Sequence, residues 1–266
     1  MVMRKFQKLV YGYYKKYGRD LPWRNTDNPY WILVSEIMLQ QTQVSRVLKK
    51  YEEFIQAFPT IQKLARAPLY KALKAWQGLG YNRRALLLHR LAQKVVSEYA
   101  GKIPSERKVL KSLPGIGEAT SGEICAFAFG QPAGFVETNI RSVFIHHFFH
   151  DRQKISDKEL LPYINKTLDK KNPRQWYYAL MDYGVYLKSQ GVNPSRRSAH
   201  YKRQSPFKGS KRQLRGKILK VLIDYRKIDE ERLSQMVLEK KNRIKNILKD
   251  LQKEGLISRK GKLIRV

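Results

Sequence analysis

The sequence predicts a mostly helical protein that ends in a small module of helices and strands. Apolar residues recur at three- and four-residue steps in long stretches before about residue 187, as in RALLLHRLAQKVVSEY, and this spacing is typical of amphipathic helices. Strand-like alternation is scarce in that part of the chain. The chain ends in LISRKGKLIRV, which indicates two short strands around a Lys-Gly turn. We therefore expect an all-α domain over residues 1–187 and a small α+β domain over 207–266.

The helices of the first domain are expected from their apolar spacing and from their ends. The stretch ILVSEIMLQQTQVSRVLKKYEEFIQAF, residues 32–58, keeps helical spacing throughout. Ser105 is expected to cap a later helix at its N-terminus. Gly130 follows EICAFAF and is expected to end another helix, because glycine readily adopts the left-handed conformation of a C-cap.

A tight turn is expected within LPGIGEATSG, residues 113–122, between two of these helices. Gly115 and Gly117 would leave the backbone N–H groups open to a phosphate. The following helix would begin at 118–120 and direct its positive dipole end at the same anion. This is a helix-hairpin-helix arrangement, and Gly115, Gly117 and Thr120 are its predicted DNA-backbone contacts. A Pro-Gly connector without a ligand is the alternative.

The charge of the chain favours a polyanionic partner. Its 266 residues carry 54 Lys and Arg against 22 Asp and Glu, a formal net charge of +32. Nucleic acid explains such an excess better than a membrane surface does. The chain has neither a signal-peptide core at its start nor an apolar run long enough to span a bilayer, so we expect a cytoplasmic protein. Its one cysteine, Cys125, lies in an apolar run and is expected to be buried.

The C-terminal part begins with a basic segment. Residues 188–220 hold eleven Lys or Arg and no acid, and we interpret 188–206 as a linker that lies on phosphates. Three helical patterns and the strand pair then follow in the order of a winged-helix module. The third helix would present Arg243, Lys245, Lys249 and Lys253; a plain charged helix face is the alternative.

Five segments together resemble a known family. They are residues 21–44, 76–92, 113–130, 136–144 and 177–184, and SEIMLQQTQV is the most specific stretch among them. In this order and at these separations they resemble the helix-hairpin-helix DNA glycosylases, and most closely the MutY-type adenine glycosylases. The resemblance implies that fold for the first domain and, as partner, duplex DNA with a mismatched or damaged base, bound by a monomer.

Two carboxylates are expected to perform the chemistry that this resemblance implies. Breaking a base–sugar bond needs a proton for the departing base and negative charge beside the cationic sugar. Glu36 lies within ILVSEIML, where burial should raise its pKa and keep a proton available for adenine N7. By resemblance Glu137 stabilises the sugar cation, and Asn139 orients the water and the carboxylate. The family has Asp at position 137, so the carboxylate is displaced by about 1.5 Å; a helix N-cap carboxylate is the alternative interpretation.

The resemblance also assigns residues that bind the DNA. Arg19, Leu21, Trp23, Val44 and Asp182 would line the base pocket, and Gln41 and Tyr81 would enter the base stack after the nucleotide is flipped out. The glycine-rich loop GLGYNRRA suits this role for Tyr81, with Arg83 and Arg84 near phosphates. Arg196 and Arg197 of the basic segment are further predicted phosphate contacts.

Three departures from the family shape what we expect of activity and cofactors. Ala119 stands where endonuclease III relatives carry the lysine that forms a Schiff base, so we expect no strand cleavage. MutY- and endonuclease III-type enzymes usually follow MDYG with four cysteines for an iron–sulfur cluster, and this chain has none there. We expect no metal cofactor, including at His146, His147 and His150, although a monovalent cation at the hairpin is compatible with the motif. The Nudix-like domain of MutY-type enzymes is also not recognisable.

Three functional hypotheses remain from the sequence. The leading one is a monofunctional glycosylase that removes adenine opposite guanine or 8-oxoguanine. The second is a thymine or uracil mismatch glycosylase. The third is a DNA-binding protein without catalysis, which would not need Glu36, Glu137 or Asn139.

Overall fold

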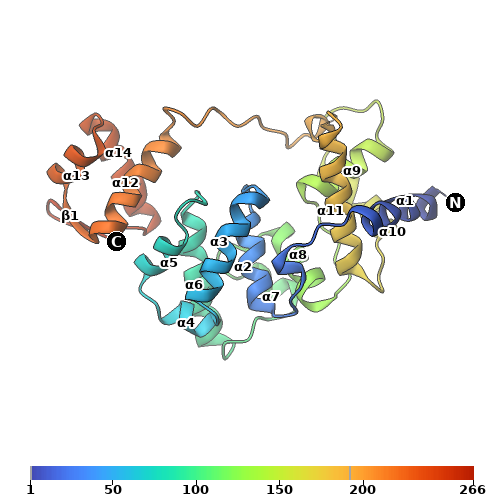
Figure 1. Cartoon of the computed structure of the whole chain (residues 1–266), viewed down its shortest axis with the longest axis horizontal. Coiled ribbons are helices and arrows are strands. Elements are labelled where there is room, and N and C mark those ends of the chain that lie inside the picture. The colour runs from blue at the N-terminus through green and yellow to red at the C-terminus, as the bar shows by residue number, and fades with distance from the viewer. Residues whose placement is uncertain (1, 192) are drawn as a thin grey trace. The chain divides into compact units, whose positions relative to one another are not determined.

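Helices dominate the computed structural model, which describes residues 2–191 and 193–266 (Figure 1). Two compact units are built from segments that are far apart in sequence. The first unit comprises the residues up to Glu36 and Ile103–Arg203, and the second comprises Ile37–Lys102 and Gln204–Val266. The predicted mostly helical fold with a small C-terminal module is confirmed.

Among the described residues of the first unit, the regular elements are all helices, and an isolated bridge joins Ile155 and Ser198. Helix α11 contacts α1, α8 and α9, while α9 also contacts α10 and the short helix η2. The elements of this unit are α1 (Val2–Tyr17), η1 (Pro22–Arg24), most of α2 (Pro29–Leu39), α7 (Arg107–Lys111), α8 (Glu118–Phe129), α9 (Thr138–Phe148), α10 (Asp157–Thr167), α11 (Pro173–Ser189) and η2 (Pro194–Arg197).

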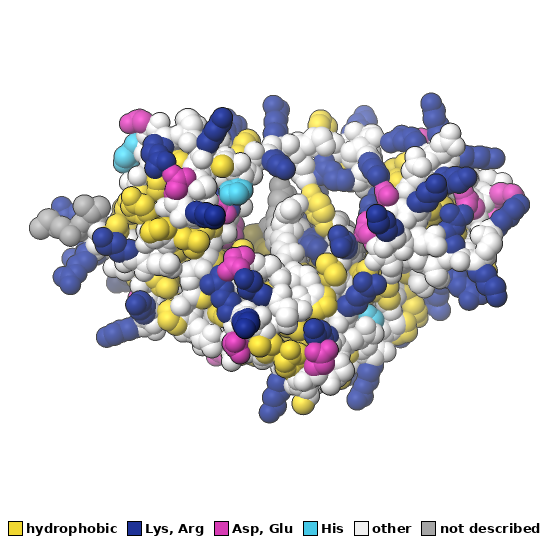
Figure 2. Space-filling model, turned by 180° about the vertical axis from the view of Figure 1, so that it is seen from behind, with side chains coloured by type: hydrophobic (Ala, Val, Ile, Leu, Met, Phe, Trp, Pro, Cys, Tyr) yellow, Lys and Arg dark blue, Asp and Glu magenta, His cyan; other side chains and the backbone are white. Residues whose placement is uncertain are grey.

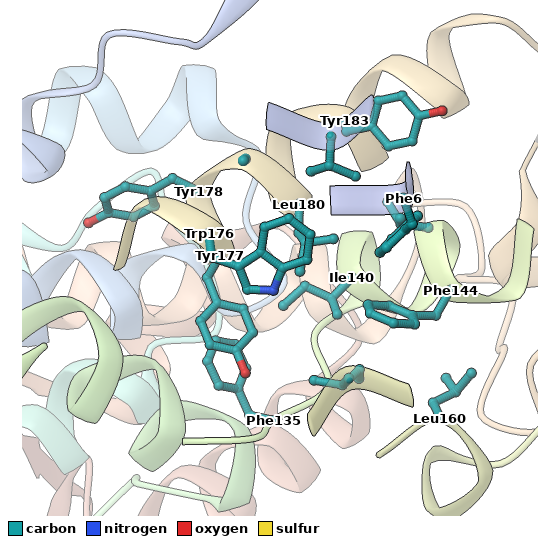
Figure 3. Packing of buried hydrophobic residues seen from close by; sticks show 14 of the residues in the cluster. Phe6, Phe135, Ile140, Phe144, Leu160, Trp176, Tyr177, Tyr178, Leu180 and Tyr183 are labelled. Atoms are coloured by element: carbon teal, nitrogen blue, oxygen red, sulfur yellow. The ribbon is translucent and has the colours of Figure 1, made fainter. Parts of the chain in front are cut away.

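Aromatic side chains fill the core of the first unit (Figure 3). The rings of Phe6 and Phe144 lie 5.5 Å apart in an edge-on arrangement, and those of Phe135 and Tyr177 lie 4.1 Å apart. The hydroxyl group of buried Tyr177 donates to the Ala133 carbonyl at 2.7 Å. Burial of each such side chain stabilises the fold by about 1.5–3 kcal/mol. This core holds α9 and α11 rigidly beside each other.

The hairpin between α7 and α8 has the predicted conformation. Gly115 has a φ of +83°, a value that favours glycine, and α8 begins at Glu118 as expected. Gly130 ends α8 in the left-handed region, which confirms its predicted role. The expected cap at Ser105 is wrong, because α7 begins at Arg107 with Glu106 at its N-cap position.

The second unit begins with the last turn of α2. The helix predicted across 32–58 is broken, because α2 ends at Leu39 and the chain turns before α3. Apolar spacing continues across this turn, so periodicity alone could not reveal it. The helices that follow are α3 (Val44–Ala57), α4 (Ile61–Arg66), α5 (Leu69–Ala75) and α6 (Arg83–Glu98), and α6 contacts both α4 and α5.

The C-terminal part of the second unit alternates helices and strands. Its elements are α12 (Lys211–Tyr225), β1 (Lys227–Asp229), α13 (Glu230–Val237), α14 (Lys241–Glu254), β2 (Ser258–Lys260) and β3 (Leu263–Arg265). The predicted strand pair is present as β2 and β3, but β1 was not predicted. The three strands form an antiparallel sheet in the order β1-β3-β2, in which Ile264 pairs with Ile228 and Arg259. This helix and strand order is that of a winged helix.

Candidate active site

Glu36 is a buried acid on α2. Its neighbours Ile32, Leu33 and Val34 are completely buried, and its own side chain is 5% exposed. Burial raises the pKa of Glu36 to about 8, assisted by the negative charge of Glu137 and opposed by a 3.3 Å hydrogen bond from the Ser35 hydroxyl group. The predicted direction of the shift is therefore confirmed, and the side chain holds a proton at neutral pH.

Glu137 lies at the N-cap of α9. Its carboxylate accepts the backbone N–H groups of Asn139 at 2.7 Å and Ile140 at 3.4 Å, and Asn139 Nδ2 donates to Glu137 Oε1 at 3.0 Å. Burial raises the pKa of Glu137, whereas these donors and the nearby Lys188 ammonium lower it. The two interpretations of Glu137, helix cap and charged group of the site, therefore coincide in one side chain.

Sequence reasoning missed a third acid, Glu123. It lies on α8, its side chain is 7% exposed, and it is hydrogen-bonded to Thr120. Burial, together with the charges of Glu36 and Glu137, raises the pKa of Glu123 well above its usual range. The signal that could have revealed it is the one used for Glu36: an acid at the edge of an apolar run, here EICAFAF.

The three carboxyl groups all have raised pKa values, because burial disfavours their ionised forms and the like charges named for Glu36 and Glu123 add to that effect. Glu137 has the richest set of donors to its charged form. For Glu36 and Glu123, burial is the largest cause of the raised pKa. The arrangement can therefore offer a protonated acid and a carboxylate in the same site, which is the division of labour that glycoside cleavage requires.

Two of the residues predicted to line the base pocket, Arg19 and Asp182, belong to an ion cluster. Asp182 is 3% exposed, and its two oxygens accept hydrogen bonds from Arg19 and Arg24 at 2.7–2.8 Å. Both carboxylate oxygens of Asp182 are thus occupied by arginine donors, and its place in the lining of the base pocket stays a prediction. The Arg24 guanidinium, not predicted from sequence, also lies 4.4 Å from the centre of the Tyr178 ring and favours the ionised form of Glu36.

The other predicted pocket residues divide between the two units. Leu21 and Trp23 are buried at 6% and 2% exposure in the first unit. Arg19 and Arg24 line an open cleft of that unit together with Tyr178. Val44, half-buried at the start of α3, belongs to the second unit.

The predicted intercalating residues share an unusual backbone conformation. Gln41 has a φ of +54° and Tyr81 a φ of +47°, and both lie in turns of the second unit. Residues other than glycine rarely adopt positive φ values of this size, and this kind of backbone strain is concentrated at functional sites. The Tyr81 side chain is 41% exposed, as a residue that enters a base stack must be.

Two of the predicted phosphate-binding arginines have internal partners. Arg84 is buried, and its guanidinium donates to the carbonyl groups of Ile37, Met38 and Gln40 at 2.5–2.9 Å. It therefore caps the C-terminal end of α2, and burial lowers its pKa to about 10.

Arg197 has the same kind of role at the end of α9. Its guanidinium donates to the carbonyl groups of Ile145, Phe149 and His150. The phosphate contacts predicted for Arg84 and Arg197 are thus wrong, because backbone carbonyls occupy their donors. Arg83 and Arg196 are exposed, as their predicted role requires.

The hairpin retains a surface suited to an anion. A Cβ atom added at Gly117 would meet no atom within 4 Å, so the space above this backbone is open. Glu118, the first residue of α8, is paired with Arg107 at 2.8 Å and with Lys111. The prediction for Thr120 needs correction, because its side chain is buried and engaged with Glu123.

Cations also cover much of the visible face. In Figure 2, Lys and Arg side chains project over that face with fewer acidic side chains between them. No helix in the described part of the chain is both long and apolar enough to cross a bilayer. The excess of Lys and Arg over acidic side chains (Figure 2) agrees with an extended polyanion as partner.

The residues after α11 do not fit an iron–sulfur cluster. Residues 185–203 contain no cysteine, and the single cysteine, Cys125, is buried in α8. Within residues 2–191 and 193–266, no group of three His, Cys, Asp or Glu side chains could hold a metal ion. His147 lies 3.1 Å from the Tyr183 hydroxyl group, and burial lowers its pKa to about 4.

Comparison with known proteins identifies the family and agrees with the fold. Residues 34–168 match the model of the "HhH-GPD superfamily base excision DNA repair protein" family. The adenine DNA glycosylase of Buchnera aphidicola is 34% identical over 68% of this chain and 52% of its own length. That of Mycolicibacterium smegmatis is 34% identical over 80% of this chain and 78% of its own length.

A solved structure of a thermostable thymine-DNA glycosylase has the same fold. It superposes with a TM-score of 0.61 at 27% identity, covering 69% of this chain and 86% of that one. The chain spans about half the length of the Buchnera relative.

Proposed function

Because the chain belongs to the HhH-GPD superfamily of base-excision DNA repair proteins, we propose that it is a DNA glycosylase that hydrolyses the bond between a mispaired base and its deoxyribose. Adenine opposite guanine or 8-oxoguanine is the proposed substrate, bound in duplex DNA by a monomer. The observation that carries this proposal is the pairing of Glu36, which holds a proton, with Glu137, which is surrounded by donors to its carboxylate.

In the proposed reaction, Glu36 donates its proton to adenine N7 as the base departs. Protonation makes the base a neutral leaving group. The sugar then carries positive charge, and the carboxylate of Glu137 stabilises it. A water molecule adds to the anomeric carbon and passes a proton to the Glu36 carboxylate, which restores the protonated acid and completes the hydrolysis.

The proposed enzyme leaves the DNA strand intact. Ala119 lies in the first turn of α8 and has no amine to form a Schiff base with the sugar. We propose in addition that it acts without an iron–sulfur cluster, since residues 185–203 offer no cysteine ligand. Strand cleavage after base release should therefore require alkali or heat.

The test is single-turnover base release from a panel of matched duplexes. They carry A, T or U opposite G, and A opposite 8-oxoguanine, with Glu98→Gln as a control variant that alters an exposed acid of α6. We expect release of adenine from both adenine mispairs. The similarity to a thymine-DNA glycosylase structure makes thymine the second candidate substrate. Release of T or U with none of A would favour that candidate, and inactivity on every duplex would favour a binding protein without catalysis.

A further inference from the structure

We propose that Lys188 is a positioning residue for the Glu137 carboxylate and that it acts through Asn139. This inference rests on the proposed function for its catalytic consequence. Its structural basis is a chain of two hydrogen bonds: Lys188 Nζ donates to Asn139 Oδ1 at 2.8 Å, and Asn139 Nδ2 donates to Glu137 Oε1 at 3.0 Å.

The ammonium group fixes which way the Asn139 amide faces. A lysine ammonium only donates hydrogen bonds, so the amide atom that it contacts is the oxygen. The amide nitrogen is thereby turned toward Glu137, where it is a donor to the carboxylate. If the amide rotated by half a turn, its oxygen would face the carboxylate oxygen, and two acceptors would repel each other. Lys188 therefore selects the orientation in which Asn139 supports a charged Glu137.

The helix packing explains how Lys188 reaches Asn139. Gly184 lies one turn earlier on α11, where a Cβ atom would be only 2.5 Å from the Asn139 carbonyl oxygen. The glycine lets α11 approach the first turn of α9 closely. The half-buried Lys188 side chain can therefore reach the Asn139 amide.

The segment after α11 supports the same turn of α9 from a second direction. The hydroxyl oxygens of Ser195 in η2 and Ser142 in α9 lie 3.2 Å and 2.9 Å from the Thr138 carbonyl oxygen, which accepts a hydrogen bond from one of them, while the other hydroxyl group donates to its serine neighbour. The two serine hydroxyl oxygens are 2.5 Å apart. The backbone that carries Glu137 and Asn139 is therefore held in place, so that the orientation of the Asn139 side chain is the remaining freedom that Lys188 removes.

Electrostatics act in the same direction. Glu137 faces Glu36 from α2 and Glu123 from α8, and it faces the cations Arg141 from its own helix and Lys188 from α11. Burial lowers the pKa of Lys188, whereas the charge of Glu137 raises it, and the Lys188 charge in turn lowers the pKa of Glu137. Loss of the ammonium should therefore make the Glu137 carboxyl group easier to protonate.

The experiment compares Lys188→Met with Lys188→Arg and with Lys166→Met, which removes the same charge from an exposed position on α10. The Glu137 carboxyl group is titrated by NMR in full-length protein labelled with 13C at the glutamate carboxyl carbons and assigned with Glu137→Gln. We expect Lys188→Met to raise the pKa of Glu137 by about one unit. Lys188→Arg and Lys166→Met should leave it within about a few tenths of the wild-type value. An unchanged titration in Lys188→Met would overturn the proposal.

Single-turnover base release gives the second measurement. The acidic limb of the rate–pH profile should move to higher pH in Lys188→Met by the same amount as the Glu137 titration. In the Asn139→Ala background Lys188→Met should have a clearly smaller effect than in the wild type, because only the direct charge–charge interaction with Glu137 remains. Additive losses would contradict this pathway. A borohydride-trapped adduct that disappears in Lys188→Met would instead assign Lys188 a covalent role and overturn the positioning role.

The two readouts separate this inference from the proposed function. If wild-type protein released no base from any duplex, the proposed glycosylase activity would be wrong. The titration of Glu137 would still show whether Lys188 positions that carboxylate.

Discussion

The carboxylates of the first unit and the cations of α14 use charge in opposite ways. Glu36 and Glu123 are buried and Glu137 is half-buried; the charge of Glu137 raises the pKa of Glu36, and the charges of Glu36 and Glu137 raise that of Glu123. The side chains of Lys245 and Lys249 on α14 are exposed, and water screens them from their neighbours.

The difference between these regions teaches where single substitutions matter. A buried charge has a few fixed partners. At most buried sites, loss of one partner therefore changes the free energy of folding by several kcal/mol. An exposed charge contributes to a field that many residues share, and its loss is partly compensated by the rest. The buried acids should therefore control the chemical step, and the exposed cations should control affinity for DNA.

The largest expected effect is loss of catalysis on substitution of the two main acids. Glu36→Gln removes the proton donor and Glu137→Gln removes the negative charge, while both retain the side-chain shape. Each should reduce single-turnover base release by about 10²–10⁴-fold, the usual contribution of a positioned acid or base. The dissociation constant for duplex DNA should change by less than about threefold, since buried acids contribute little to the phosphate contacts that dominate affinity.

The contrast between the carboxylate site and the cations of α14 would fail if Glu36 and Glu137 were dispensable for base release. Base release at the wild-type rate in both would remove Glu36 and Glu137 from the chemical step. The control Glu98→Gln, with an exposed acid that lies near Lys94, should behave as wild type in both measurements.

Glu123→Gln should have a smaller effect, seen in stability. The raised pKa of Glu123 means that the folded protein keeps a proton which the unfolded chain releases above pH ~4.5. Wild-type stability from this group is thus present at low pH and declines as pH rises toward the folded pKa, by at most about 1.4 kcal/mol per pH unit. The glutamine variant cannot ionise and avoids this loss.

Chemical denaturation at pH 5 and pH 8 measures the difference. The free energy of unfolding of Glu123→Gln, relative to that of the wild type, should be larger at pH 8 than at pH 5, which means that the variant gains relative stability as pH rises. A relative stability that is independent of pH would mean that Glu123 titrates normally, and the acidic site would then hold two coupled carboxyl groups instead of three.

The parts of the site that could be predicted from the sequence are those marked by their immediate neighbours in the chain. Glu36 stands out as an acid within an apolar run, and the Leu-Pro-Gly-Ile-Gly turn follows from glycine chemistry at Gly115 and Gly117. Glu123 carries the same local signal as Glu36, so it was accessible to the same reasoning. The fold class was predictable for a similar reason, because helical periodicity is a property of neighbouring residues.

The sequence did not reveal pairings between distant segments. The Arg84 guanidinium donates to carbonyl groups of α2 that lie more than forty residues earlier in the sequence. The Arg197 guanidinium donates to carbonyl groups at the end of α9. Asp182 meets Arg19 from a distant part of the chain. An arginine followed by polar residues looks the same in sequence whether it contacts phosphate or a helix end, so only the folded backbone separates these roles.

The smallest expected effect concerns the exposed lysines of α14, and it sharpens the comparison from the other side. The double variant Lys245→Gln/Lys249→Gln should weaken duplex binding and make the slope of log K against log salt less steep by about 2, since each lost phosphate contact contributes roughly 0.9. Single-turnover base release at saturating protein should remain at the wild-type rate, because neither lysine belongs to the carboxylate site. Lys158→Gln/Lys166→Gln removes the same charge from exposed positions on α10 and is the matched control. A slope that changes equally in both double variants would show that only total charge matters, and a slope unchanged in the α14 variant would show that the winged-helix-like module does not contact the DNA through this helix.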